Sequence, residues 1–299
     1  MKEVVLPGKR RVWCTARGDK ELEVVYEEIF EMHTYEQGGV RVRDGDVVVD
    51  VGANIGLFAI CLLERYRDLR VVCIEPAPPT RACLERNLEG WEGREGHEIT
   101  TLPWALGARE DDAVIEFLPG LPANSSVHPG DKRAQLETVV QQFTLSDLWH
   151  LNRSRPAVAL MLVLLTLLIY PFRRIAYRRV VQHGMDGASR FPCKVRPLDA
   201  VLEECALTRV DLLKVDVEGA ELEVLEGLGS AGLARVRQLA IEIEPYHKPR
   251  LPALMARLTR AGFESLSVQG ATGTGDGLDD PYPCMLYAVR TAETEGAPS

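Results

Sequence analysis

The chain has 299 residues, enough to bury a sizeable core, and its 46% hydrophobic and 26% charged residues are typical of a soluble globular protein. A formal net charge of −9 argues against nucleic acid as the main partner, because phosphate binding needs a basic face. The seven cysteines show no CxxC or His-paired spacing, which predicts reduced thiols and no metal site.

Residues 1 to 45 begin with MKEVVLPGKRRVW, which has no apolar core followed by a small-residue cleavage site. We therefore predict a cytoplasmic protein. Short strands are expected first, then a helix around Leu22 to Met32. These elements are predicted to form a lid or an edge, in which Tyr35 either reaches over a bound cofactor or closes a surface loop.

The stretch Val47 to Ile60, VVVDVGANIGLFAI, has the pattern of a buried parallel strand that runs through a glycine turn into a helix. Such a turn points backbone N–H groups and the positive end of a helix dipole at a ligand, and its glycines let the ligand approach closely. The spacing DxGxxxG differs from the GxGxxG of dinucleotide-binding turns, and no Gly-Lys-Ser/Thr follows to make a P-loop. We predict a nucleotide-like cofactor at this turn.

The next strand, Arg70 to Glu75, ends in a carboxylate about twenty residues after the turn, where it can accept hydrogen bonds from both ribose hydroxyls of a nucleoside. A helix over Thr80 to Leu88 and a third unit at Ile99 to Leu106 follow. In that unit Trp104 and Ala105 either form a slot for a purine or belong to the core. The alternation predicts a doubly wound parallel sheet with its ligand crevice at the carboxyl ends of the strands.

After a further strand at Ala113 to Leu118, the alternation stops between Pro119 and about Arg190. The middle of this insertion is AVALMLVLLTLLIY, Ala157 to Tyr170, flanked by prolines and arginines. The run is shorter than the roughly twenty residues that cross a bilayer as a helix. We expect either peripheral contact with a membrane through residues 153 to 180, or a buried or dimerising helix.

The alternation resumes at Val195 to Cys205, where Asp199 is predicted as a helix N-cap. VDLLKVDVEGAELEVLE, Val210 to Glu226, then predicts a buried strand that carries Lys214 and Asp216, followed by a helix. Glu218 and Glu221 lie near the start of that helix, where dipole stabilisation is the alternative to contact with a substrate.

Leu239 to Ile243 is another apolar strand, and it contains Glu242. Charges on buried strands are costly unless they are paired or used. Lys214, Asp216 and Glu242 are therefore predicted to meet at one crevice, either as catalytic groups or as a structural ion-pair network. The rest of the chain predicts a helix at Pro252 to Ala261 and a strand at Phe263 to Val268. The glycine-rich loop GATGTGDG, Gly270 to Gly277, is expected to act as a lid, and a last strand follows at Met285 to Arg290.

Five motifs in the chain occur in a characteristic order: VVDVGANIGLFA, IEPAPPTRACLERN, ALG, LLKVDVEGAELEVLEG and EIEP, which begin at Val48, Ile74, Ala105, Leu212 and Glu242. Together they resemble the FkbM-type family of S-adenosylmethionine-dependent methyltransferases. The resemblance implies a class I methyltransferase (Rossmann-like) α/β fold. Its seven-stranded, mostly parallel sheet has helices on both faces and an antiparallel last strand, to which this chain would add the apolar helical insertion.

The resemblance also implies the site. Asp50, Gly52, Asn54 and Gly56 are expected around the methionine part of S-adenosylmethionine, Glu75 at its ribose, and Tyr35 and Ala105 elsewhere on the cofactor. Lys214, Asp216 and Glu242 are the expected catalytic residues, and Glu218 and Glu221 are expected to bind substrate.

The activity that the resemblance implies is O-methylation of a small molecule or sugar, and the insertion, which departs from the family pattern, favours a lipidic acceptor at a membrane. We expect lid or edge elements at residues 1–45, followed by the cofactor-binding half of the methyltransferase domain at 46–118. The insertion covers 119–190, the second half of the domain 191–290, and a disordered tail 291–299. A binding module without turnover, and a soluble enzyme that self-associates through the insertion, stay open as alternatives.

Overall fold

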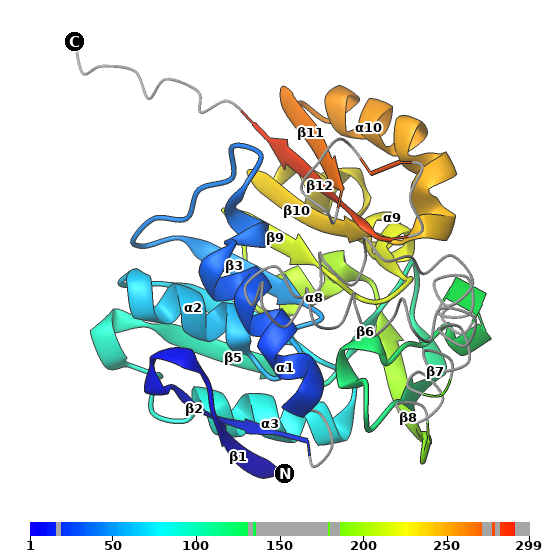
Figure 1. Cartoon of the computed structure of the whole chain (residues 1–299). Helices are drawn as coiled ribbons and strands as arrows, with labels where there is room; N and C mark the ends of the chain where they lie inside the picture. The colour runs from blue at the N-terminus through cyan, green and yellow to red at the C-terminus, as the bar shows by residue number, and fades with distance from the viewer. Residues whose placement is uncertain are drawn as a thin grey trace, which may run out of the picture.

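A seven-stranded sheet forms the centre of the computed structural model, with strands in the order β11-β12-β10-β9-β3-β4-β5 (Figure 1). The structure describes residues 1–15, 19–130, 134–135, 179, 186–270, 277–278 and 282–290. The strands of the sheet are β3 (Val47–Val51), β4 (Arg70–Ile74), β5 (Glu98–Leu102), β9 (Leu212–Val215), β10 (Gln238–Ile243), β11 (Ser265–Gly270) and β12 (Cys284–Val289).

The direction of the strands agrees with the predicted sheet. Strand β3 pairs in parallel with β4 on one side and with β9 on the other, and β9 pairs in parallel with β10. Strand β12 is antiparallel to both of its neighbours, β10 and β11. The sheet is therefore mostly parallel with an antiparallel last strand, as a class I methyltransferase fold requires.

Helices cover both faces of the sheet, because successive side chains of the buried strands point to opposite sides. Val48 packs into the apolar cluster that contains residues of α1, α2 and α3, whereas Val49 packs into the cluster of α8, α9 and α10. These helices are α1 (Asp19–Tyr26), α2 (Leu57–Arg65), α3 (Pro78–Leu88), α8 (Leu198–Glu204), α9 (Glu221–Ala234) and α10 (Leu251–Arg260).

Two smaller sheets flank the central one. The hairpin of β1 (Lys2–Val5) and β2 (Arg11–Cys14) lies beside α3, and β6 (Ala105–Leu106), β7 (Asp111–Phe117) and β8 (Ser189–Arg196) form a three-stranded sheet in the order β6-β8-β7 (Figure 1). The predicted third unit, residues 99–106, is divided between two sheets, since Pro103 offers no N–H to continue β5.

Two local predictions need correction. The helix expected around Leu22 to Met32 is α1 followed by a π-helical turn, Glu27–Glu31, and a 3-10 turn at Thr34–Glu36. The N-cap of α8 is Pro197, and Asp199 lies in the first helical turn, because the strand before it runs directly into Pro197 and Pro is well suited to a helix start.

Three predictions fall outside the described residues: the apolar segment 157–170 with most of its insertion, the tail 291–299, and residues 271–276 of the glycine-rich loop. Among the residues that the structure describes, no helix is both long and apolar enough to cross a membrane.

Candidate functional site

Two cavities lie at the carboxyl ends of the central strands, where a doubly wound sheet places its ligand. The larger has a volume of about 420 Å³ and the smaller about 70 Å³. They adjoin one another, since both are lined by residues of the glycine turn, of the loop after β7 and of the turn after β9, namely Gly52, Asn54, Pro122, Ala123, Asp216 and Glu218.

The glycines of the turn after β3 serve the packing of the protein itself. Gly52 has a φ of +76°, and a Cβ there would lie 1.7 Å from the backbone oxygen of Asp216. Gly56 has a φ of +87°, and its Cβ would lie 2.7 Å from Cδ1 of Leu84 in α3. The missing side chains thus make room for neighbouring protein atoms, while Gly52 itself also lines both cavities.

A buried charged pair supports the same turn. Asp50 in β3 is fully buried, and its Oδ1 lies 2.9 Å from Nζ of Lys214 on the adjacent strand β9. The ammonium also donates to the carbonyl oxygen of Gly52 at 2.8 Å and lies 3.7 Å from Oδ2 of Asp216. Burial alone would lower the pKa of Lys214, but the carboxylates of Asp50 and Asp216 outweigh it and raise that pKa, so Lys214 stays protonated.

Asp216, which follows β9, accepts a hydrogen bond from the hydroxyl of Tyr35 at 2.8 Å. The Tyr35 ring packs edge-on against Phe58, and Nζ of Lys214 lies 5.0 Å from its centroid. Burial, reinforced by the negative charges of Asp216 and Glu242, raises the pKa of Tyr35 well above its ordinary value. Tyr35 is therefore a neutral donor that orients the Asp216 carboxylate.

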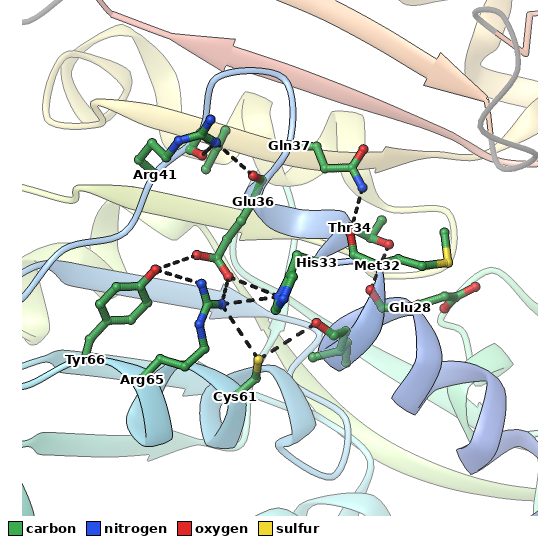
Figure 2. Close-up of polar contacts among 12 residues, drawn as sticks. Glu28, Met32, His33, Thr34, Glu36, Gln37, Arg41, Cys61, Arg65 and Tyr66 are labelled. Carbon is green, nitrogen blue, oxygen red and sulfur yellow. Dashed lines mark hydrogen bonds and ion pairs between the residues drawn. The ribbon is translucent and has the colours of Figure 1, made fainter. Parts of the chain in front are cut away.

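The segment that carries Tyr35 is anchored by polar contacts to the C-terminal end of α2, which Figure 2 shows, and to β12. The carboxylate of Glu36 forms an ion pair with Arg65, and its other oxygen accepts from the hydroxyl of Tyr66 at 2.9 Å. Arg65 in turn donates to the Tyr66 hydroxyl at 3.0 Å. Behind Tyr35, the hydroxyl of Tyr287 donates to the Thr34 carbonyl at 2.6 Å. These contacts fix the Tyr35 hydroxyl at Asp216.

Glu75, which follows β4, lines the smaller cavity together with Trp104 and Ala105. Its carboxylate accepts from the backbone N–H of Asn54 at 3.0 Å and of Ala77 at 2.9 Å. Burial raises the pKa of Glu75 to about 7, although these two hydrogen bonds oppose the shift. The residues predicted for the ribose and for the purine slot thus lie in one cavity.

The other predicted residues divide into two groups. Glu242 lines the larger cavity and Glu218 lines both. Glu221 is not among the residues that line either cavity, and its carboxylate accepts from the Gly219 N–H at 2.6 Å and lies 3.0 Å from Nδ1 of His247. Glu221 therefore fixes the turn after β9, and a contact with substrate has no support in this geometry.

The sequence of the chain matches a known protein family over most of its length. The sequence model described as the methyltransferase FkbM domain matches residues 50–265. The chain belongs to the FkbM methyltransferase family.

The chain is similar to several individual proteins. The 31-O-demethyl-FK506 methyltransferase FkbM of Streptomyces tacrolimicus is 30% identical over 272 residues, 91% of each chain. The AMB antimetabolite synthetase AmbE of Pseudomonas aeruginosa is 34% identical over 297 residues, which is 98% of this chain but 13% of that protein. The crystal structure of a methyltransferase FkbM from Methylobacillus flagellatus KT aligns with a TM-score of 0.47 at 17% identity, covering 85% of this chain and 46% of that one.

The cofactor of this FkbM-family chain is S-adenosylmethionine, as the motifs predict. The site fits such a ligand, because Oδ1 of Asn54 and Nε1 of Trp104 are buried without a hydrogen-bond partner among the described residues. One atom is an acceptor and the other a donor, and both residues line the adjoining cavities. A ligand with a nucleoside and a charged tail offers partners to both.

Several residues of the site were not predicted. Thr15, Glu28 and Gln135 line the larger cavity, and residues 121–124 form one of its walls. Glu21 in α1 holds that wall, since its carboxylate accepts from the Ala123 N–H at 2.9 Å and from the Asn124 side chain at 2.8 Å. These residues lie in segments without a motif, so no local signal in the sequence could have found them.

Proposed function

We propose that the FkbM-family chain transfers the methyl group of S-adenosylmethionine to an oxygen, of a hydroxyl or carboxyl group, on a small-molecule, sugar or lipidic acceptor. The observation that carries the proposal is the position of Asp216 where the two cavities adjoin, with its side chain 23% exposed. The bound cofactor supplies an already activated methyl group. The protein then has to orient the acceptor oxygen and take its proton.

In this proposal Asp216 is the general base. The hydrogen bond from Tyr35 engages Oδ2 and holds the carboxylate in one orientation, which leaves Oδ1 to accept the proton. Nζ of Lys214 lies 3.7 Å from Oδ2 of Asp216, and its contacts with Asp50 and Gly52 make Lys214 a positioning residue. Glu242 lines the same cavity and is the second candidate for the base.

Two observations favour an oxygen on an amphipathic acceptor. The name of the Streptomyces tacrolimicus relative, 31-O-demethyl-FK506 methyltransferase, describes transfer to an oxygen of that compound. The larger cavity is lined both by apolar side chains such as Leu22, Val25 and Phe58 and by carboxylates such as Asp216 and Glu242. An acceptor with an apolar body and a hydroxyl suits such a cavity.

The proposed setting is the cytoplasm, with peripheral membrane contact through residues 153–180, of which the structure describes residue 179 alone, and without nucleic acid as a partner. A liposome co-sedimentation assay should show more binding by the full chain than by a chain that lacks residues 153–180. Equal binding by both would refute the membrane contact. A change of molecular size on the same deletion would instead support self-association through the insertion.

The function itself is tested with Asp216→Asn, and Asp112→Asn is the matched control because Asp112 lies on β7, where its partner is Lys194 at the surface. Methyl transfer from labelled S-adenosylmethionine into a lipid and metabolite extract is followed by mass spectrometry, and affinity for S-adenosylhomocysteine by calorimetry. We expect Asp216→Asn to lose at least about a hundredfold in transfer, the scale of a missing general base, with unchanged affinity. Unchanged transfer would remove Asp216 as the base, and tight binding without transfer in the unmodified chain would favour a binding module.

A further inference from the structure

We propose that Thr15 binds the amino-acid end of S-adenosylmethionine, so that the N-terminal hairpin completes the cofactor site. Thr15 directly follows β2 and lies outside residues 50–265, which the family match covers. The inference rests on the proposed function and on the expectation, drawn from the family resemblance, that Glu75 holds the ribose of the cofactor.

The first support is an unsatisfied hydroxyl. Thr15 is 5% exposed, and its Oγ1 has no hydrogen-bond partner among the described residues. The residue lines the larger cavity, as does Asn54, whose buried Oδ1 also lacks a partner in the described part of the chain. Buried polar atoms in proteins are nearly always hydrogen-bonded, so two such atoms in one cavity point to a ligand that satisfies both.

The second support is a side chain that joins the hairpin to the glycine turn. Nδ2 of Asn87 in α3 donates to the carbonyl of Trp13 at 2.9 Å and to the carbonyl of Ile55 at 2.8 Å. Its Oδ1 accepts from the Trp13 N–H at 2.6 Å. Thr15 is two residues beyond Trp13, and Asn54 precedes Ile55, so Asn87 ties together the two segments that place these unsatisfied side chains in the lining of one cavity.

The third support is the chemistry of the ligand. With the nucleoside at Glu75 in the smaller cavity, the rest of the cofactor extends past Gly52 and Asn54 into the larger one. That end of the molecule carries an ammonium and a carboxylate. The amide oxygen of Asn54 can accept only from the ammonium, whereas the Thr15 hydroxyl can donate to the carboxylate. The two unsatisfied groups, the Asn54 amide oxygen and the Thr15 hydroxyl, thus suit the ammonium and the carboxylate of the cofactor.

The test compares Thr15→Val with Thr80→Val. Valine has the shape of threonine without its hydroxyl, and Thr80 in α3 is a matched control: it is 2% exposed, its Oγ1 is also without a partner among the described residues, and it is not among the residues lining either cavity. Calorimetry measures the Kd for S-adenosylhomocysteine and for 5′-methylthioadenosine, which lacks the amino-acid end.

We expect Thr15→Val to weaken S-adenosylhomocysteine about tenfold, the loss of one hydrogen bond to a charged group, and to leave 5′-methylthioadenosine unchanged. Thr15→Ser should retain the affinity, and Thr80→Val should change neither Kd. An unchanged Kd in Thr15→Val, or equal losses for both ligands, would overturn the inference. If the unmodified chain bound neither ligand, the proposed function would fall as well.

Discussion

Two turns at the carboxyl ends of neighbouring strands both line the candidate site. One follows β3 and the other follows β9, and the two strands are hydrogen-bonded in parallel register. Each turn holds a left-handed glycine and a left-handed residue with a side chain: Gly52 and Asn54 in the first, and Gly219 and Glu218 in the second. Both turns therefore depend on residues with a positive φ.

The chemistry of the two turns differs. The charged residue of β3, Asp50, is fully buried under its turn, whereas Asp216 after β9 is 23% exposed where the cavities adjoin. Gly52 is packed against backbone, and Gly219 against the end of the Tyr246 side chain. The first turn thus depends on close packing, and the second places the carboxylates of Asp216 and Glu218 in the lining of both cavities. Substitutions in the first should act mainly on stability, and those in the second mainly on turnover.

The largest expected effect is that of Gly52→Ala. Its Cβ would lie 1.7 Å from the backbone oxygen of Asp216, and backbone cannot move away as a side chain can. We expect a loss of about 4 kcal/mol or more in the free energy of unfolding, measured with urea. Gly45→Ala is the matched control, because Gly45 has a φ of +80° and nothing within 4 Å, and it should lose about 1–2 kcal/mol. Equal losses would show that backbone strain, and not the contact with β9, governs the turn.

Lys214→Met should have the next largest effect. It leaves the fully buried carboxylate of Asp50 without its cation, which typically costs about 3–5 kcal/mol in the free energy of unfolding. Adding Asp50→Asn to Lys214→Met should recover part of the lost free energy of unfolding, since it removes the buried, unpaired negative charge. By contrast, Asp216→Asn should change stability by less than about 1 kcal/mol, because its side chain is partly exposed. If Asp216→Asn destabilised the protein as much as Lys214→Met does, the two turns would not differ in their effect on stability.

Gly219→Ala should cost less than Gly52→Ala. Its Cβ would lie 2.0 Å from the hydroxyl of Tyr246, which is the far end of a side chain that can rotate away. With a φ of +115°, we expect a loss of about 1–2 kcal/mol in thermal or urea unfolding. Combining it with Tyr246→Phe should restore some of that loss, and no restoration would place the cost in the backbone alone.

The smallest expected effect is a pH dependence of cofactor affinity. The pKa of Glu75 is raised to about 7 by burial, and only the carboxylate can accept from both ribose hydroxyls. Affinity for S-adenosylhomocysteine should therefore fall about tenfold from pH 8 to pH 6, as the carboxyl takes up a proton. Glu75→Gln should give a flat calorimetric profile. The same shift means that folding of the free protein weakens as pH rises from about 4.5 to 7.

The sheet, and the expectation that Lys214 is paired or used, follow from the sequence because their signals are local. Buried parallel strands show as apolar runs, and a charge inside such a run, as at Asp50 or Lys214, must find a partner on a neighbouring strand. The motif order then fixes which strands carry the site. This reasoning does not reach the identity of the partner, and the contact of Lys214 with Gly52 was not expected.

Long-range contacts without a motif could not be predicted. Tyr35 meets Asp216 across 181 positions of the sequence, and neither residue carries a local sign of the other. The β6-β8-β7 sheet joins residues on both sides of the insertion, so its pairing depends on chain that the pattern leaves unassigned. Glu221 was misjudged for the opposite reason: its place at a helix start is visible, but the Gly219 and His247 contacts that bury it are not.

The anchoring of Tyr35 by Glu36, Arg65 and Tyr66 has a practical consequence for protein engineering. The family match begins at residue 50, yet the phenol that orients Asp216 and the hairpin that carries Thr15 lie before it. A gene fragment trimmed to the matched region would lose one wall of the larger cavity, and it would also cut β3, nearly all of β11 and the whole of β12 from the sheet. A shortened gene that keeps the site therefore has to include the β1–β2 hairpin, the chain that follows it up to β3, and the strands β11 and β12.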